Sequence, residues 1–291
     1  MLALAVLAVL AQAPASRAVA AALRDPAGEP SLPSSLDVQD RRFPPLHYAR
    51  FAAPTFAGDL RWDEVIQGQL GSCFFLSTLA AIAKTHPEFV ADAIRREGDG
   101  AFAVTLSSPN GQAVVVGVND RLPATAAGKL YFARGRDAGE LRPALFEKAY
   151  AKLAGGYEAV NGGEPADAFR VLTGVAGRDH PLAKSAEEEI WTLLARAEKA
   201  RRPVVASTPK YAELRRAAGR DDLAGVIDDH SYAFLGRDEK AGERRVRLYT
   251  PLSPGDAGYA KDGPRVLELP LRDFKKYFES VTIGDVPARR K

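Results

Sequence analysis

Three stretches in the first two thirds of the chain carry the hydrophobic pattern of helices. Residues 72–85 are apolar almost all round and stop before Pro87, which predicts a buried helix. Residues 143–160 begin with a proline and place apolar side chains on one face, as an amphipathic helix does. Residues 165–172 predict a shorter helix that is closed by Gly174.

The second half of the chain changes character after one more helix. Ser185 and Glu188 form a capping-box pattern ahead of a helix over residues 186–200. Short apolar runs then predict strands, with one short helix over residues 271–279 among them. The strand-like runs are residues 203–208, 230–239, 244–251, 265–270 and 280–286. In the first half, residues 101–108 and 112–120 predict a hairpin with its turn at 109–111.

These elements predict an α+β protein of two lobes with an active-site cleft between them. The helical first lobe covers residues 60–176, and the antiparallel, β-rich second lobe covers residues 177–291. Residues 19–59 are rich in Pro and Ser and have no sustained period. They are interpreted as a linker or as a strap that lies over a domain.

The first residues resemble a secretory signal peptide. Residues 2–11 are uncharged and apolar but too short to span a bilayer. A small-x-small pattern at residues 11–13 follows, so residues 1–18 predict export to a secreted or periplasmic location. The alternative is a misplaced start codon and a cytoplasmic protein, because the usual positive n-region is absent.

Composition narrows the partners. The chain has 40 Lys and Arg against 37 Asp and Glu, and no basic block is long enough to indicate a nucleic-acid or membrane surface. We therefore expect no nucleic acid and no stable membrane insertion once the signal is cleaved. The single cysteine excludes an intrachain disulfide and any cluster of cysteine ligands. It is either a small buried hydrophobe or a reactive thiol.

The surroundings of this cysteine favour a nucleophile. Ser72 is predicted to cap the helix that opens at Cys73, and the positive end of a helix dipole lowers a thiol pKa. Of the four histidines, His47 lies in the Pro-rich segment, His86 follows the helix that carries the cysteine, and His180 is assigned to an interlobe loop. His230 begins an apolar strand in the opposite lobe and is the one on rigid scaffold facing a cleft. Gln67 lies in a glycine-containing turn just before the helix, where its side chain could donate to an oxyanion or simply be exposed.

The chain resembles the protease core of calpains, which are papain-like cysteine proteases. Residues 67–76, QGQLGSCFFL, are similar to the family pattern QGxLGDCWFL, and residues 143–163 resemble its next helix and Gly-Gly segment. Further matching segments follow in the family's order over residues 60–286: NDRLP, GKLYF, DDHSYAF, RLYTP and RDFKKYF. The resemblance implies endoproteolysis of protein or peptide substrates through a thioester, with Cys73 as nucleophile, His230 as base and Gln67 as oxyanion donor.

The departures from the family pattern define the open questions. The third triad member is normally Asn, and here Thr250 stands before Pro251, so activity is expected to be retained but reduced. Leu252 replaces the tryptophan that blocks the resting cleft in the family. A catalytically weak pseudoprotease that binds peptides, or an acyltransferase using the same pair, are the alternative functions.

The resemblance suggests calcium as a cofactor. Glu64 and Asp167 match acidic ligands of the family's first-lobe calcium site. The glycine loop that completes that site is not recognisable, and two ordinary surface carboxylates are the alternative interpretation.

Overall fold

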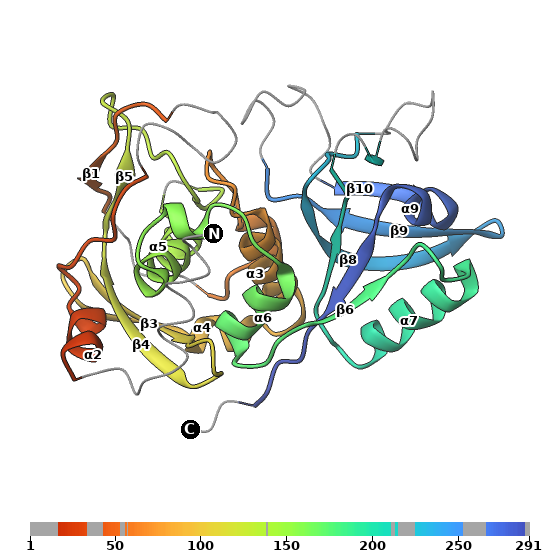
Figure 1. Cartoon of the computed structure of the whole chain (residues 1–291), viewed down its shortest axis with the longest axis horizontal. Coiled ribbons are helices and arrows are strands. Elements are labelled where there is room, and N and C mark those ends of the chain that lie inside the picture. The colour runs from red at the N-terminus through yellow and green to blue at the C-terminus, as the bar shows by residue number, and fades with distance from the viewer. Residues whose placement is uncertain are drawn as a thin grey trace.

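The computed structural model describes residues 17–33, 43–52, 56, 58–137, 139–210, 213–214, 225–252 and 266–288. The apolar run at residues 2–11 and its cleavage pattern lie outside the described residues. The described chain forms two lobes side by side, with helix α3 near the boundary between them (Figure 1). Helices and antiparallel sheets occur in both lobes, so the α+β prediction is confirmed.

The helices of the first lobe are α3 (Cys73–Thr85), α4 (Pro87–Asp92), α5 (Arg142–Ala154) and α6 (Pro165–Thr173). Helix α3 is buried along most of its length and ends just before the proline, as the pattern predicted. Helix α5 is shorter than expected, because Gly155 adopts a left-handed φ of 97° and ends it. The expected remainder forms a separate 3-10 turn, η2 (Glu158–Val160). Gly174 closes α6 with a φ of 84°.

Two small antiparallel sheets complete the first lobe. Strands β2 (Ile94–Gly98), β3 (Ala101–Ser107) and β4 (Ala113–Asn119) pair in that order, which confirms the predicted hairpin. Strand β1 (His47–Arg50) pairs with β5 (Arg121–Ala124).

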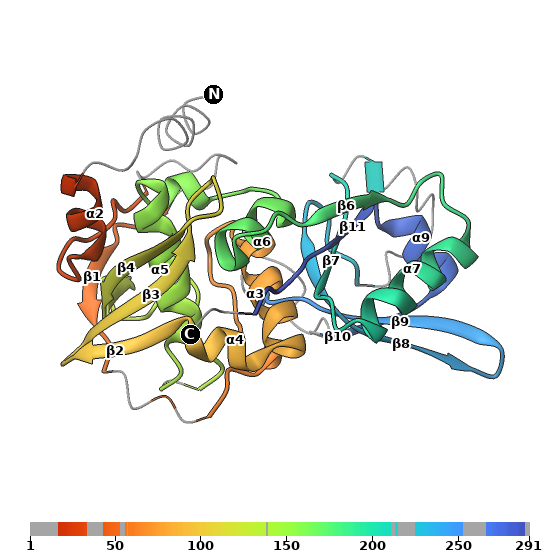
Figure 2. The ribbon, with the colours of Figure 1, turned by 90° about the horizontal axis from the view of Figure 1, so that it is seen from below.

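The segment at residues 19–59 has more structure than its composition indicated. It contains β1 and most of helix α2 (Arg17–Arg24) and packs on the first lobe (Figures 1 and 2). The Tyr48 hydroxyl donates to the carbonyl of Pro30 at 2.6 Å, and the Asn119 side chain donates to the carbonyl of Pro26 at 2.6 Å. Its described residues are therefore built into the outer side of this lobe.

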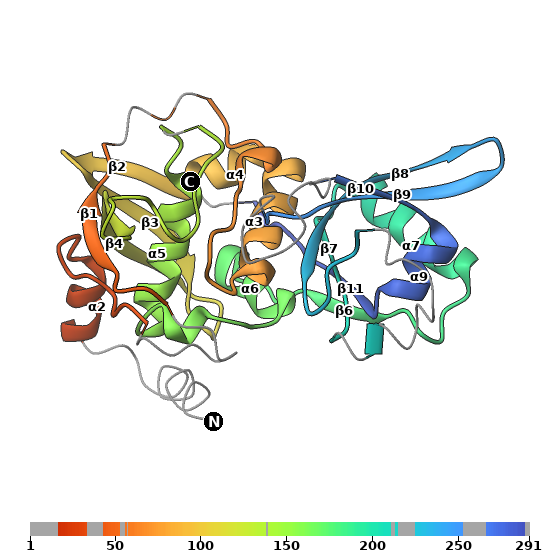
Figure 3. The same cartoon turned by 90° about the horizontal axis from the view of Figure 1, so that it is seen from above.

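The second lobe is a six-stranded antiparallel sheet in the order β10-β9-β8-β7-β11-β6. Its strands are β6 (Arg178–Pro181), β7 (Val204–Ser207), β8 (Ser231–Lys240), β9 (Glu243–Tyr249), β10 (Val266–Pro270) and β11 (Ser280–Ile283). Helices α7 (Glu187–Lys199) and α9 (Leu271–Tyr277) pack on the sheet, and the β8–β9 hairpin extends away from the first lobe (Figure 3).

Two local predictions in this lobe were wrong. His180 was assigned to an interlobe loop, but it lies in β6 and pairs with Val281 of β11. The capping pattern at the start of α7 is displaced by one residue, because Glu189 rather than Glu188 accepts the backbone N–H of Ala186 at 2.8 Å. Glu188 instead pairs with Arg244.

Among the described residues, the buried apolar side chains form two clusters. The first surrounds α3 and α5 and also takes in residues from β7, β8 and β9, including Ala233 and Tyr249. The second lies between the six-stranded sheet and helices α7 and α9. Helix α3 thus packs against strands of the second lobe as well as against the core of the first lobe. Among the described helices, none is long and apolar enough to cross a membrane.

Candidate active site

Cys73 is the first residue of α3 and is partly exposed. Ser72 occupies the N-cap position, as predicted, but its side chain does not cap the helix. The Ser72 hydroxyl donates instead to the Glu147 carboxylate at 2.5 Å. The local capping rule therefore placed the helix start correctly and missed the partner of the serine.

The pKa of the Cys73 thiol differs from what its helix position suggested. Burial raises this pKa to about 11 and outweighs the hydrogen bonds from the backbone of Ser231 and Phe74 that lower it. The charge of Asp229 raises it further. The backbone at the helix start thus lowers the pKa as expected, but burial outweighs it and leaves the pKa of the thiol above its ordinary value.

His230 directly precedes β8 and is held by its backbone. Its N–H donates to the Thr208 hydroxyl at 3.1 Å, and its carbonyl accepts the N–H of Thr208 at 2.9 Å. Asp229 before it has a left-handed φ of 45°, a conformation that is strained for a residue with a side chain. The chain is therefore turned sharply just ahead of the imidazole.

The imidazole of His230 has Thr250 as its partner. The Nε2 atom lies 2.8 Å from the Thr250 hydroxyl, and both residues are buried. The same hydroxyl accepts the backbone N–H of Leu252 at 3.2 Å. Burial lowers the pKa of His230 to about 3, so the ring is neutral at physiological pH.

Helix α3 and strand β8 bring Cys73 close to the His230 segment. Ser77 lies one helical turn after the cysteine, and its hydroxyl donates to the carbonyl of Ser231 at 2.7 Å. Ser231 also reaches the Cys73 thiol through its backbone and its hydroxyl. Because Thr250 takes Nε2, the other ring nitrogen of His230, Nδ1, is the one left for chemistry.

The remaining histidines lie in other elements. His47 is in β1, His180 is in β6, and His86 follows α3 at its far end. None of these three histidines lies at the first turn of α3, where Cys73 stands.

Gln67 is buried and joined to the Thr250 segment. Its backbone N–H donates to the carbonyl of Pro251 at 2.9 Å, and it forms a parallel bridge with Leu252. Its side-chain nitrogen donates one proton to the carbonyl of Leu70 at 2.7 Å. An amide nitrogen has two protons, so one is left for an oxyanion. The side-chain oxygen is buried without a hydrogen-bond partner among the described residues.

Two residues near Cys73 were not predicted from the sequence. The Asn161 side chain accepts the N–H of Gly71 at 2.7 Å, and the N–H of Gly162 donates to the carbonyl of Gly71 at 2.8 Å. Glu147 holds Ser72, as described above. Both Asn161 and Glu147 lie in residues 143–163, the segment that resembles the family's helix and Gly-Gly segment. Their partners are distant in sequence, however, so no local sequence pattern predicts these contacts.

The two predicted calcium ligands do not form a metal site in the described part of the chain. The Glu64 carboxylate accepts the backbone N–H of Arg61 at 2.7 Å. Asp167 is exposed in the first turn of α6, with Arg170 at 3.9 Å. No group of three or more acidic, histidine or cysteine side chains suited to a metal occurs among the described residues. Calcium takes six to eight oxygen ligands, of which these two carboxylates alone would supply only a part.

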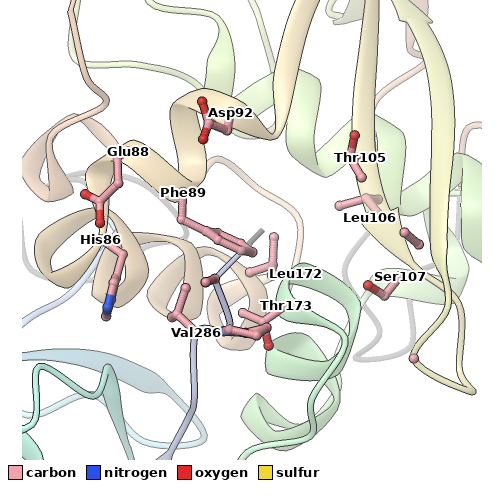
Figure 4. A pocket seen from close by; sticks show the side chains of 14 residues that line it. His86, Glu88, Phe89, Asp92, Thr105, Leu106, Ser107, Leu172, Thr173 and Val286 are labelled. Atoms are coloured by element: carbon pink, nitrogen blue, oxygen red, sulfur yellow. The ribbon is translucent and has the colours of Figure 1, made fainter. Parts of the chain in front are cut away.

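Two hollows of the described surface lie away from Cys73 and His230. The first, of about 970 Å³, has Phe89 and Leu172 in its wall, with the carboxylates of Glu88 and Asp92 nearby (Figure 4). The second, of about 540 Å³, lies between β6 and α7. Neither lining includes Cys73 or His230.

Comparison with known proteins agrees with this geometry. The sequence profile of the calpain family of cysteine proteases matches residues 41–254. The calpain-type cysteine protease DEK1 of Arabidopsis thaliana is 32% identical over 206 residues, which are 67% of this chain and 9% of the plant protein. Mouse calpain-9 is 28% identical over 196 residues, covering 66% of this chain and 28% of its own length. Human calpain-12 is 32% identical over 264 residues, covering 80% and 36%.

These relatives are much longer than the region they share with this chain, which spans 9% of the plant protein and about a third of the animal ones. The match nevertheless covers most of the chain and includes Cys73, His230 and Thr250. The chain belongs to the calpain family of cysteine proteases.

Proposed function

We propose that this protein is a cysteine endopeptidase that cleaves peptide bonds of protein substrates through a thioester. The observation that carries the proposal is the 2.8 Å contact between His230 Nε2 and the Thr250 hydroxyl, while Ser231, the residue after His230, contacts the Cys73 thiol. When Nε2–H donates to this hydroxyl, Nδ1 of the imidazole can act as a base toward the thiol. Membership of the calpain family supports the same chemistry.

The reaction uses each of these groups in turn. His230 Nδ1 takes the thiol proton while Cys73 Sγ attacks the peptide carbonyl carbon. The oxyanion that forms accepts hydrogen bonds from the second Nε2 proton of Gln67 and from the Cys73 backbone N–H. The intermediate then collapses to a thioester, and the departing amine takes the proton from His230. Water, deprotonated by His230, finally attacks the thioester and releases the acid and the free thiol.

The raised pKa of the thiol and the lowered pKa of the imidazole favour a mechanism in which attack and proton transfer occur together. With a thiol pKa of about 11 and an imidazole pKa of about 3, an ion pair is unfavourable before substrate binds. The second proton of Gln67 and the backbone N–H stabilise negative charge only once it develops on the substrate oxygen. This is the differential stabilisation that raises a rate.

Substitution of the nucleophile tests the proposal. We expect Cys73→Ala to abolish cleavage of a fluorogenic peptide and of a denatured protein substrate, with its thermal melt unchanged. Cleavage that persists in this variant would show that the thiol is not the nucleophile. A folded wild-type protein that cleaves nothing would indicate a peptide-binding pseudoprotease. Transfer of the acyl group to an added amine in preference to water would indicate an acyltransferase.

Calcium dependence and export are further proposals, each with its own measurement. Calcium rests on the matches of Glu64 and Asp167 to family ligands, although their arrangement here does not form a site. Cleavage rates measured with calcium and with a chelator test this dependence, and equal rates would contradict it. Export to a secreted or periplasmic location rests on the apolar run at residues 2–11. The N-terminal sequence of the mature protein tests it, and retention of this run would contradict it.

A further inference from the structure

Glu147 is a buried carboxylate that the mechanism above does not use. It lies in α5 and is only 1% exposed. Both of its oxygens are occupied: Oε1 accepts the Ser72 hydroxyl at 2.5 Å, and Oε2 accepts the backbone N–H of Ala133 at 2.9 Å. Its neighbour Lys148 is no counter-ion, since that ammonium group donates to Asn119 and Arg121 and pairs with Glu29.

The first contact fixes the start of the nucleophile helix. Ser72 immediately precedes Cys73, and its carbonyl accepts the first backbone bonds of α3, from Phe75 and Leu76 at 3.0 Å. A residue held from both its hydroxyl and its carbonyl has little freedom to rotate. The bond to Glu147 therefore sets where α3 begins and which way the thiol leaves the helix.

The second contact fixes the support of the oxyanion donor. Ala133 lies in a segment that pairs with the chain on either side of Gln67. Ile66 and Arg134 exchange two backbone hydrogen bonds of 2.9 Å, and the N–H of Gln69 donates to the carbonyl of Tyr131 at 3.0 Å. The two segments lie so close together that residue 68 must be a glycine, because a Cβ there would lie 2.3 Å from the carbonyl oxygens of residues 131 and 132.

We propose that Glu147 is a positioning residue that holds Cys73 and Gln67 in register, by binding Ser72 with one oxygen and Ala133 with the other. The inference rests on the proposed function, in which these two side chains act on the same carbonyl group. An error of about 1 Å between nucleophile and oxyanion donor is enough to cost on the order of a hundredfold in rate. A single buried carboxylate that joins both supports prevents such an error.

The chemistry of the two contacts favours a carboxylate at this position. Both partners are donors, and an ionised carboxyl group accepts at each oxygen. Burial raises the pKa of Glu147 to about 7, and the bonds from Ser72 and Ala133 hold it below the value that burial alone would give. A glutamine has one acceptor oxygen in place of two. Either its NH2 group faces the N–H of Ala133, or it turns and donates to the Ser72 hydroxyl oxygen, and in both cases the charged acceptor is lost.

A double-mutant cycle between residues 72 and 147 tests the inference. Ser72→Ala should lower kcat for peptide cleavage about tenfold while KM changes less than twofold, since a hydrogen bond to a charged group is lost but no substrate contact is. Glu147→Gln should lower kcat at least as much. In the Glu147→Gln background, Ser72→Ala should cause less than a twofold further loss, because the two residues act through one bond.

Thr78→Ala is the matched control. Thr78 is buried in the same helix and its hydroxyl also makes one hydrogen bond, to the carbonyl of Phe74 at 2.7 Å, but it has no link to Glu147. Its kcat should stay within twofold of wild type. The inference is overturned if Ser72→Ala behaves like Thr78→Ala, or if the effects at residues 72 and 147 multiply. If Glu147→Gln does not fold, the comparison of Ser72→Ala with Thr78→Ala still decides.

The rate of iodoacetamide labelling separates this inference from the proposed function. Cys73 is the only cysteine in the sequence, so labelling reports on it alone, whether or not peptides are cleaved. We expect Ser72→Ala to slow labelling at least fivefold and Thr78→Ala to leave it unchanged. Equal labelling rates in the two variants would refute the positioning role even if Cys73→Ala abolishes cleavage.

Discussion

Replacement of Thr250 distinguishes a working triad from a chance contact. The hydroxyl already accepts the N–H of Leu252, and it lies 2.8 Å from His230 Nε2. If Nε2–H donates to the hydroxyl, Nδ1 is unprotonated and can act as the base. If the hydroxyl donates to Nε2, the proton is on Nδ1 and the ring cannot take one from the thiol. A threonine permits both tautomers, whereas the carbonyl oxygen of an asparagine only accepts.

This ambiguity sets the size of the expected effects. If the two tautomers are close in energy, about half the molecules are competent, and full restoration gains only about twofold. A bias of about 1.4 kcal/mol toward the wrong tautomer would allow a gain of about tenfold. We therefore expect Thr250→Asn to raise kcat about two- to tenfold. Thr250→Val keeps the shape but removes the hydroxyl, and it should lower kcat more than tenfold by leaving the imidazole unoriented.

Stability must be measured beside activity. Thr250→Val leaves Nε2 of His230 and the N–H of Leu252 buried without their partner, which costs about 1–3 kcal/mol. Thr282→Val is the matched control: its hydroxyl is also buried in the second lobe and donates to Asp179 at 3.1 Å. It should lower the melting temperature similarly without changing kcat. An unchanged kcat in Thr250→Val would refute the triad role of this residue.

Three further predictions concern other buried polar groups. Gln67→Ala should lower kcat about a hundredfold or more, because it removes an oxyanion donor. The loss of stability should be small, because the substitution also removes a buried side-chain oxygen that has no hydrogen-bond partner among the described residues. A kcat within threefold of wild type would exclude the donor role. Burial lowers the pKa of His230 to about 3, so the unfolded chain binds this proton first as the pH falls below 6.5, and the stability that the neutral ring contributes is lost on the way to pH 3. The free energy of unfolding of wild type should therefore exceed that of His230→Asn by about 3 kcal/mol less at pH 4 than at pH 7, as measured by urea titration. A difference that does not change with pH would contradict the burial argument. Glu29→Gln should lower the free energy of unfolding by about 3 kcal/mol at pH 7, because it unpairs the fully buried Lys148. Burial lowers the pKa of that lysine to about 8, so the deficit should shrink as the pH rises to 9.5, and a growing deficit would be evidence against the pair.

Much of the fold follows from local pattern. Helix α3 was predictable because its side chains are apolar on every face and Pro87 sets its end. The β3–β4 hairpin was predictable because two β-branched runs flank a turn that Gly111 closes with a φ of 80°. Strand β6 was not, since three of its four residues are polar and three are exposed, and only pairing with β11 makes them a strand.

The site was less predictable than the fold, for a physical reason. Capping preference and helix dipoles describe what a residue can do with its near neighbours along the chain. Ser72 bonds instead to a carboxylate 75 residues away, and burial in the folded chain raises the pKa of Cys73 although hydrogen bonds from Ser231 and Phe74 lower it. Both outcomes depend on which groups tertiary structure brings close, and one sequence does not contain that information in local form.

The order of the chain also conceals how the site is held together. The lobes are consecutive in sequence, yet three hydrogen bonds of 2.7–2.9 Å join the Cys73 side to the His230 side: Ser77 to Ser231, Gln67 to Pro251 and Tyr249 to Val65. Tyr249 belongs to the hydrophobic cluster that surrounds α3, although it lies in β9. Cys73, His230 and Gln67 thus stand on one packed unit made of α3 with the residues before it, the start of β8 and the end of β9. A change that loosens this unit should therefore reduce catalysis before it unfolds either lobe, because the site depends on packing between the lobes more than on either lobe alone.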